Sequence, residues 1–166
     1  MNSESCFFCN VRDNLSNNLI LFENDLFIAK YSGVPVNPGH IELFPRRHIE
    51  TLLDLNHLEK RELVRSIGQT QDMLSRVDFE AFYKLMLLRA GQQIVKNYAQ
   101  KMLQLSFINN NPTGFNVGIN QGVSAGQTVK HLHIHLIPRF DGDTPDPIGG
   151  VRNLLNNGLG NYKALF

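Results

Sequence analysis

Three histidines alternate with aliphatic residues in the short stretch HLHIHLI, and this pattern restricts the fold more than any other feature of the chain. The histidines are His131, His133 and His135, with Leu or Ile after each of them. Because strand side chains alternate between faces, a strand here would carry the three histidines on one face and the aliphatic residues on the other. The aliphatic face would pack on helices, and the imidazoles would line a small cleft.

Such a row of imidazoles is suited to three kinds of chemistry. Neutral imidazole is a common zinc ligand. Histidine also titrates near neutral pH and acts as a general acid or base, and a ring nitrogen can attack an electrophile such as phosphorus. A polar strand face with solvated histidines is the fourth interpretation. Strict alternation over three histidines favours a functional role.

The remaining hydrophobic pattern predicts strands, then helices, then strands. Asn56 begins a helix, because Glu59 follows three residues later as in a capping box. This order predicts an α+β domain with an antiparallel sheet. The other expected elements are two β-runs within 19–31, a strand at 40–44, a second helix after Asp78, a strand at 115–120 and the histidine strand at 128–137.

Composition and charge limit the classes of protein to consider. The 166 residues are expected to form a single domain, 1–166, and 16 Lys and Arg nearly balance 15 Asp and Glu. This balance argues against broad electrostatic binding of nucleic acid, which requires a basic surface. We expect no secretion signal and no membrane span, because no apolar leader and no apolar run of about 18 residues occur. Two cysteines are too few for a disulfide framework, so the cytoplasm is the expected location.

A loop with two glycines, NQGVSAGQ, precedes the histidine row. Gly122 and Gly126 allow close approach of the backbone to a ligand, and successive backbone N–H groups in such turns bind anions. Gln127 and Thr128 add side-chain donors at the end of the loop. Beside a row of histidines, this loop indicates a phosphate held next to a nucleophile.

Four stretches of the chain carry motifs of one known family. They are GQTVKHLHIHLIPR, PVNPGHIELFPRRHI, CFFC and FNVGINQGVSAG. They resemble the histidine triad (HIT) family of nucleotide hydrolases and transferases, in particular its bacterial members with an N-terminal CxxC pair. The resemblance implies a HIT-like fold with an antiparallel sheet of about five strands, two or three helices, and a homodimer.

The resemblance also implies a mechanism. His133 would form a covalent nucleotidyl-histidine at the α-phosphate, and water would then hydrolyse it without a catalytic metal. The implied product is a nucleoside monophosphate, released from dinucleoside polyphosphates or phosphoramidates of adenine or guanine. The family's motifs assign catalytic roles to His133, His135, Gln127 and Thr128, and substrate contacts to Asn120 and Gly126.

Other functions remain open at this point. A nucleotidyltransferase would use the same intermediate with another acceptor, although His135 argues against a transferase branch that has glutamine there. A sensor would bind nucleotide with little turnover. A metal-binding interaction module would depend on its cysteines and histidines.

The nucleoside contacts are less certain from sequence. The family's sugar contact is usually Asp or Asn, whereas this chain has Ser32 at that position. A hydroxyl still forms hydrogen bonds, but it cannot accept two sugar hydroxyls as a carboxylate does. Phe27 and Ile28 match the strand that supplies apolar walls to the base pocket, and core packing is an equally good interpretation of both.

The cysteine pair has the spacing of half a zinc site. A redox pair and two ordinary thiols are the alternatives. Cys6 and Cys9 match family positions at which His48 and His131 complete a structural zinc site, so the resemblance implies zinc. His131 would then be a ligand rather than a catalytic group.

The segment from about residue 78 to 104 is longer than the family pattern requires and is rich in Phe, Leu and Met. It would cover the sheet, extend a dimer surface or shield the active site, and the sequence does not choose among these.

Overall fold

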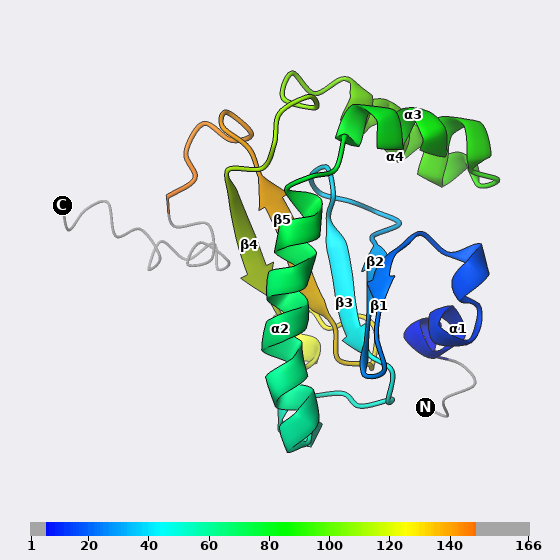
Figure 1. Ribbon diagram of the computed structural model, residues 1–166, viewed down its shortest axis with the longest axis vertical. Helices are drawn as coiled ribbons and strands as arrows, with labels where there is room; N and C mark the ends of the chain where they lie inside the picture. The colour runs from blue at the N-terminus through cyan, green and yellow to red at the C-terminus, as the bar shows by residue number, and fades with distance from the viewer. Residues whose placement is uncertain (1–5, 149–166) are drawn as a thin grey trace.

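A five-stranded antiparallel sheet with helices on both faces forms the part of the chain that the computed structural model describes, residues 6–148. The strand order is β1-β2-β3-β5-β4 (Figure 1). This arrangement confirms the predicted α+β class. The elements are α1 (Phe7–Asp13), η2 (Leu15–Asn17), β1 (Ile20–Glu23), β2 (Phe27–Tyr31), β3 (Ile41–Pro45), η3 (Leu52–Asp54), α2 (His57–Leu74), α3 (Phe79–Arg89), α4 (Gln93–Leu103), β4 (Gly114–Gly118), η4 (Val123–Ala125) and β5 (Ile134–Arg139).

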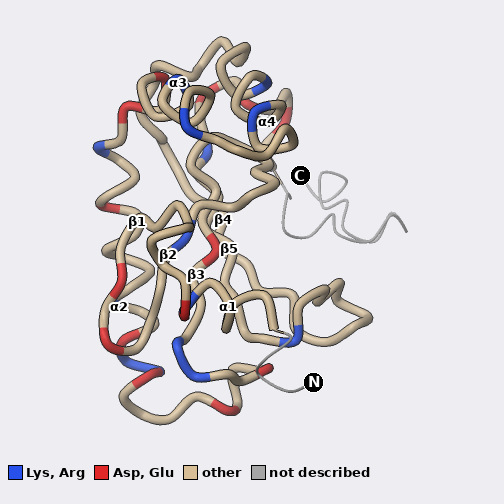
Figure 2. Tube along the Cα trace, turned by 90° about the vertical axis from the view of Figure 1, so that its right-hand side faces the viewer, with Lys and Arg blue, Asp and Glu red and all other residues tan. Residues whose placement is uncertain are grey.

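The two faces of the sheet bury two separate hydrophobic clusters. Phe27, Leu43 and Ile134 belong to the main core, which is covered by α2 and the helices that follow it. Ile28 and Phe44 point to the other face and pack against α1. In Figure 2, α2 and α1 accordingly lie on opposite sides of the sheet. The histidine-bearing side of β5 shares its face with α1.

The histidine strand is shorter than the sequence predicts. We expected strand over 128–137, but β5 begins at Ile134, so His131 and His133 lie in the segment before it. Extension of the β3–β5 register from Leu43 and Ile134 would place Leu132 opposite Pro45, which has no N–H for the ladder. The N–H of Leu132 instead donates to the carbonyl of Ile49 at 2.6 Å. The chain therefore joins the sheet only after the first two histidines.

The predicted start of α2 is confirmed in detail. The Asn56 side chain accepts a hydrogen bond from the Glu59 N–H at 2.9 Å, and the Glu59 carboxylate accepts one from the Asn56 N–H at 2.8 Å. The two groups satisfy N–H groups that the first helical turn leaves unpaired.

The structure has four α-helices in its described residues, where two or three were expected. The short helix α1 was not foreseen. The segment after Asp78 divides into α3 and α4 at a turn containing Gly91, a residue of low helix propensity. Phe79, Tyr83 and Met86 of α3 are buried, whereas Ile94 at the start of α4 is 54% exposed.

Charged residues of both signs are distributed over the described chain (Figure 2). Several form ion pairs, for example Arg47 with Glu59 and Arg139 with Asp143. No helix within residues 6–148 combines the length and the hydropathy needed to cross a bilayer.

Candidate active site and metal centre

His133 is held in one orientation by its neighbours. Its side chain is buried, and its Nδ1 lies 2.8 Å from the carbonyl oxygen of His131. A carbonyl only accepts, so Nδ1 carries the proton and the neutral ring has its lone pair on Nε2. The ring of Phe8 in α1 lies 4.9 Å from the His133 ring, centroid to centroid, and restricts its rotation.

His135 forms a second histidine pair on the same face. Its ring lies 5.0 Å from that of His133, and its Nδ1 lies 3.0 Å from Nε2 of His40. Burial, and then the neighbouring His135, lower the pKa of His40 to about 4. Burial and His133 also lower the pKa of His135. Both rings of the His40–His135 pair are therefore neutral near pH 7.

The hydrogen-bond chain then fixes the tautomer of His135. The N–H of Val36 donates to Nδ1 of His40 at 3.4 Å, so the proton of neutral His40 is on Nε2. That proton is donated to Nδ1 of His135, which leaves the His135 proton on its own Nε2. His40 lies in the loop directly before β3. Its sequence position carried no signal of the contact with His135.

A buried polar group lies on the neighbouring strands of this face. Ser32 donates its hydroxyl proton to Oε1 of Glu42 at 2.9 Å, and Nζ of Lys30 lies 3.5 Å from Oε2. Lys30 also donates to the carbonyl of Tyr31 at 2.8 Å. Glu42 is the register partner of His135. Lys30 and Glu42 carry no functional signal in the sequence, because each follows the alternation of an ordinary strand.

The glycine loop is braced from within. Oε1 of Gln127 accepts the N–H of Gly122 at 2.7 Å, and its Nε2 donates to the carbonyl of Glu50 at 3.0 Å. The side chain of Asn120 donates to the carbonyl of Gly126 at 3.4 Å. Gly122 and Gly126 have φ of 87° and 84°, a conformation that favours glycine. Thr128 is exposed at the end of this loop.

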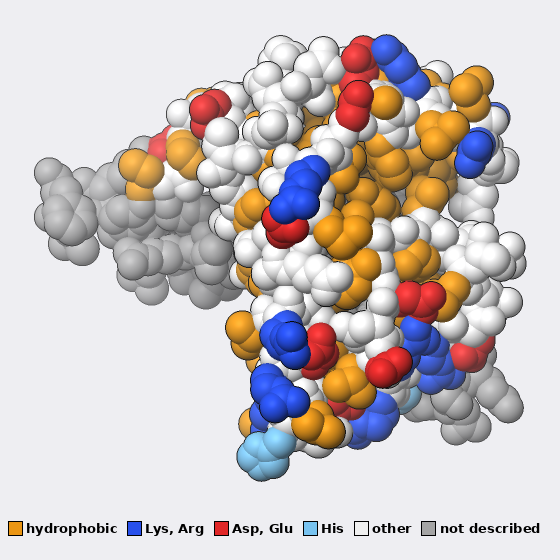
Figure 3. Space-filling view, viewed as in Figure 1, with side chains coloured by type: hydrophobic (Ala, Val, Ile, Leu, Met, Phe, Trp, Pro, Cys, Tyr) orange, Lys and Arg blue, Asp and Glu red, His pale blue; other side chains and the backbone are white. Residues whose placement is uncertain are grey.

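A pocket of ≈ 570 Å³ lies beside this polar group, between η2, the end of β2 and the turn joining α3 to α4. Ser32 and Lys30 line it, together with Phe7 and Leu19. Figure 3 shows hydrophobic side chains gathered between the α3–α4 helices and the sheet. Phe27 and Ile28 are fully buried on opposite faces of the sheet and are not among the lining residues.

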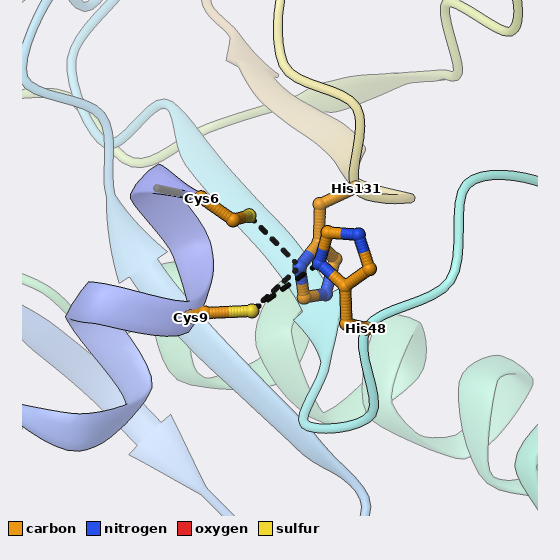
Figure 4. Close-up of side chains that lie close together, drawn as sticks. All are labelled: Cys6, Cys9, His48 and His131. Carbon is orange, nitrogen blue, oxygen red and sulfur yellow. Dashed lines mark hydrogen bonds between the residues drawn. The ribbon is translucent and has the colours of Figure 1, made fainter. Parts of the chain in front are cut away.

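Cys6, Cys9, His48 and His131 converge at one point, with one ligand atom from each lying within 4.8 Å of the others (Figure 4). Sγ of Cys6 lies 3.4 Å from Nδ1 of His131, and Sγ of Cys9 lies 3.3 Å from Nδ1 of His48. The family resemblance implied these four residues. Cys6 caps the start of α1 and Cys9 lies in its first turn. His131 can contact them because it lies in the segment before β5 and is not part of the strand.

The chemistry of this cluster fits a metal ion. Nε2 of His131 lies 2.8 Å from the carbonyl oxygen of Pro45, so it carries the proton and Nδ1 presents its lone pair to the thiols. Burial lowers the pKa of His131 to about 4, which keeps the ring neutral. Burial and the adjacent Cys6 raise the pKa of Cys9 to about 11, so a metal would have to displace its proton. Two sulfurs and two imidazole nitrogens form a set that can bind a metal.

Solved structures share this fold. A HIT family protein from Bacillus anthracis aligns over 82% of this chain and 74% of its own, with a TM-score of 0.57 and 23% identity. A Zn-bound histidine triad family protein from Mycobacterium smegmatis aligns over 87% and 86%, with a TM-score of 0.54 and 23% identity. The fold is thus that of the histidine triad class.

Sequence comparison identifies the family. The family described as HIT domain matches residues 14–142, and the chain therefore belongs to it. AP-4-A phosphorylase of Mycobacterium tuberculosis (strain CDC 1551 / Oshkosh) is 32% identical over 126 residues, which is 75% of this chain and 48% of that protein. The asymmetrical bis(5'-nucleosyl)-tetraphosphatase of Schizosaccharomyces pombe is 28% identical over 147 residues, 89% and 63% respectively. The chain thus spans about half to under two thirds of the length of these two relatives.

Proposed function

We propose that this protein is a nucleotide hydrolase in which His133 attacks the α-phosphate and releases a nucleoside monophosphate from a dinucleoside polyphosphate or a nucleoside phosphoramidate. The observation that carries the proposal is the 2.8 Å contact from Nδ1 of His133 to the carbonyl oxygen of His131. In the neutral ring this contact places the proton on Nδ1, so the lone pair of Nε2 is available as the nucleophile. The relatives named as a phosphorylase and a tetraphosphatase support nucleotide chemistry.

The proposed reaction has two displacements at phosphorus. Nε2 of His133 forms a bond to the α-phosphorus while the bond to the leaving group breaks, and the leaving group departs with that electron pair. When the leaving group is the amine of a phosphoramidate, it takes up a proton from solvent as it departs. Water then forms the new P–O bond and releases a proton to solvent, and the His133–phosphorus bond breaks with its electron pair returning to Nε2. The proton on Nε2 of His135 is donated to a phosphate oxygen and stabilises the developing charge. Gln127, Thr128 and Asn120, at the two ends of the glycine loop, would lie around the phosphate.

The pocket beside Ser32 is our candidate for the nucleoside site. Because the Ser32 hydroxyl proton is donated to Glu42, its oxygen presents only lone pairs to a ligand, as a carboxylate does. One of those lone pairs faces the Val34 N–H at 3.3 Å, and the other can accept a sugar hydroxyl. Lys30 lies two strands from His135, roughly 10 Å at ordinary strand spacing. A nucleoside in the pocket would place its phosphate near the histidines. Phe27 and Ile28 would support the site only indirectly, through the packing of β2.

We also propose that the metal at Cys6, Cys9, His48 and His131 is zinc. Two thiolates and two imidazoles are a typical donor set for a closed structural zinc site, and the zinc-bound relative supports this choice. The site would fix α1 to the segment that carries the nucleophile. In this proposal the metal supports the position of His133 and does not form a separate metal-dependent interaction module.

The proposal is tested by mixing the protein with adenosine 5'-phosphoramidate or diadenosine tetraphosphate and following intact mass and products. A hydrolase gives an adenylylated protein in the first turnover and then AMP. If inorganic phosphate is added and ADP replaces AMP, the acceptor is phosphate and the protein is a nucleotidyltransferase, the alternative that the phosphorylase relative favours. Nucleotide binding without any adduct or product would contradict both enzymes and leave a nucleotide sensor.

Replacement of His40 should slow catalysis without abolishing it. His40→Ala removes the donor that holds His135 in the tautomer with its proton on Nε2, so we expect kcat/KM to fall by about 10- to 100-fold, the effect seen for partners that orient catalytic groups. His40→Gln restores a donor and should recover most of the loss. The measurement is steady-state kinetics of the three proteins, with circular dichroism as a control for folding. An equal loss in His40→Ala and His40→Gln would assign His40 a packing role only.

We also propose that the protein is a homodimer located in the cytoplasm. Two buried thiols at ligand distance fit a reducing compartment. Light scattering on the purified protein should give twice the mass of one chain.

A further inference from the structure

The turn between α3 and α4 forms the outer wall of the pocket beside Ser32. Arg89, Ala90 and Gln92 line that side, and Phe7 and Lys30 line the inner side. The volume of ≈ 570 Å³ lies in the range of small-molecule sites. The segment whose role the sequence leaves open therefore contributes directly to the site.

The first turns of α3 pack on the sheet and on the loop before β3, and these contacts position the helix that leads to the turn. The hydroxyl of Tyr83 accepts the N–H of Gly39 at 3.2 Å, and the ring of Phe82 stacks on Tyr31 at 4.4 Å between centroids. A Cβ at Gly39 would lie 2.5 Å from the Phe79 ring, which shows how closely α3 approaches the loop before β3. Glycine at this position permits that approach.

Two cations line the pocket, and Arg89 is the one without an ion pair among residues 6–148. It forms no ion pair with any carboxylate of residues 6–148, and no Asp or Glu of that range lines the pocket. Lys30, the other lining cation, already contacts Glu42 and the Tyr31 carbonyl. The side chain of Arg89 is exposed at the rim, where a ligand can reach it.

The hydrogen-bonding groups of a guanidinium restrict which bases it can bind through two hydrogen bonds. Arginine has five N–H donors, no acceptor, and stays protonated. Guanine presents two adjacent acceptors, O6 and N7, which a guanidinium binds through two parallel hydrogen bonds. Adenine presents N7 next to an N6 amino donor, which would oppose one of those N–H groups.

We propose that the α3–α4 turn is the base-specificity element of this protein, and that Arg89 selects guanine over adenine. The proposal rests on the function proposed above, in which the pocket holds the nucleoside. It assigns the α3–α4 segment a role in substrate choice.

Binding of GMP and AMP to the wild-type protein, measured by calorimetry, tests this choice without requiring turnover. We expect GMP to bind at least about tenfold more tightly than AMP, and Arg89→Ala to weaken GMP binding about tenfold while AMP changes less than about twofold. Arg89→Lys keeps the charge but loses the paired geometry, so GMP binding should stay weak. Arg76→Ala, an exposed arginine outside the pocket, is the matched control and should bind both nucleotides as the wild type does.

Two results would overturn the proposal. One is equal binding of GMP and AMP by the wild type. The other is an equal loss of affinity for GMP and AMP in Arg89→Ala, together with recovery of both affinities in Arg89→Lys. That result would show that Arg89 contacts the phosphate and not the base. The same proteins are assayed for turnover of guanosine and adenosine 5'-phosphoramidates. If binding selects guanine through Arg89 but no turnover occurs, the proposed hydrolase is refuted and the base contact stands. If turnover occurs without selectivity, only the base contact is refuted.

Discussion

His133→Asn should reduce kcat by about 10⁴-fold or more, the scale seen when a covalent nucleophile is removed. Asparagine occupies similar space and can still donate to the carbonyl that His133 Nδ1 contacts. It has no ring nitrogen that could form a bond to phosphorus. The measurement is single-turnover release of nucleoside monophosphate together with intact mass, in which the adduct should be absent.

The matched control for this variant is His57→Asn. His57 is an exposed histidine at the first position of α2, so its replacement should leave the rate unchanged. Nucleotide binding by His133→Asn should persist, since the pocket walls are intact. A His133→Asn protein with near wild-type turnover would exclude nucleophilic catalysis at this residue and favour the interaction module.

Cys9→Ser should remove the metal and destabilise the protein. Cys9 is 1% exposed, and Sγ lies within reach of both histidines of the cluster. A ligand whose free concentration is about 1,000 times its Kd stabilises the folded protein by about 4 kcal/mol. Loss of zinc bound at that saturation would lower the free energy of unfolding by the same amount. For a chain of this size, this corresponds to a fall in Tm of roughly 10 °C. Zinc per chain, by elemental analysis, should drop from about one to near zero. Thermal unfolding gives the stability change.

Activity should fall with the metal, because α1 carries both cysteines and the ring of Phe8 that packs on His133. A chelator should reproduce the loss of stability in the wild type and have no further effect on Cys9→Ser. Asp13→Asn, a change at an exposed acidic residue of the same helix, should keep its zinc. A metal-free wild type with the same Tm as the zinc-loaded protein would refute the structural zinc site.

Much of the site was predictable because its residues are adjacent in sequence. The alternation around His133 and the glycine loop before it are local patterns, and one short motif carries the candidate nucleophile and its phosphate loop. The helix start at Asn56 is equally local, since its two hydrogen bonds join residues three apart. The cysteine pair indicated half of a metal site by spacing alone, and only the family resemblance supplied its histidines.

The tertiary structure decided the contacts that join distant segments. The pairing of His40 with His135 spans 95 residues, and no periodicity reports such a contact. The burial of Lys30 beside Glu42 depends on the register of β2 against β3. Because the β3–β5 ladder ends at Leu43 and Ile134, only His135 of the three histidines is a strand residue. His133 is a buried ring tied to a carbonyl, and His131 lies in the cluster with the two cysteines.

The sequence by itself determined which chemical groups are present and which short elements carry them, because helix caps, strand alternation and glycine turns are set by neighbouring residues. Only the packing of the sheet against its helices decided where those groups point. The turn at Arg89 illustrates this division: the sequence predicts the helix on which it lies, and the tertiary fold places it at the rim of the pocket that Ser32 lines. Side-chain position across a fold depends on long-range burial, which local propensity does not encode.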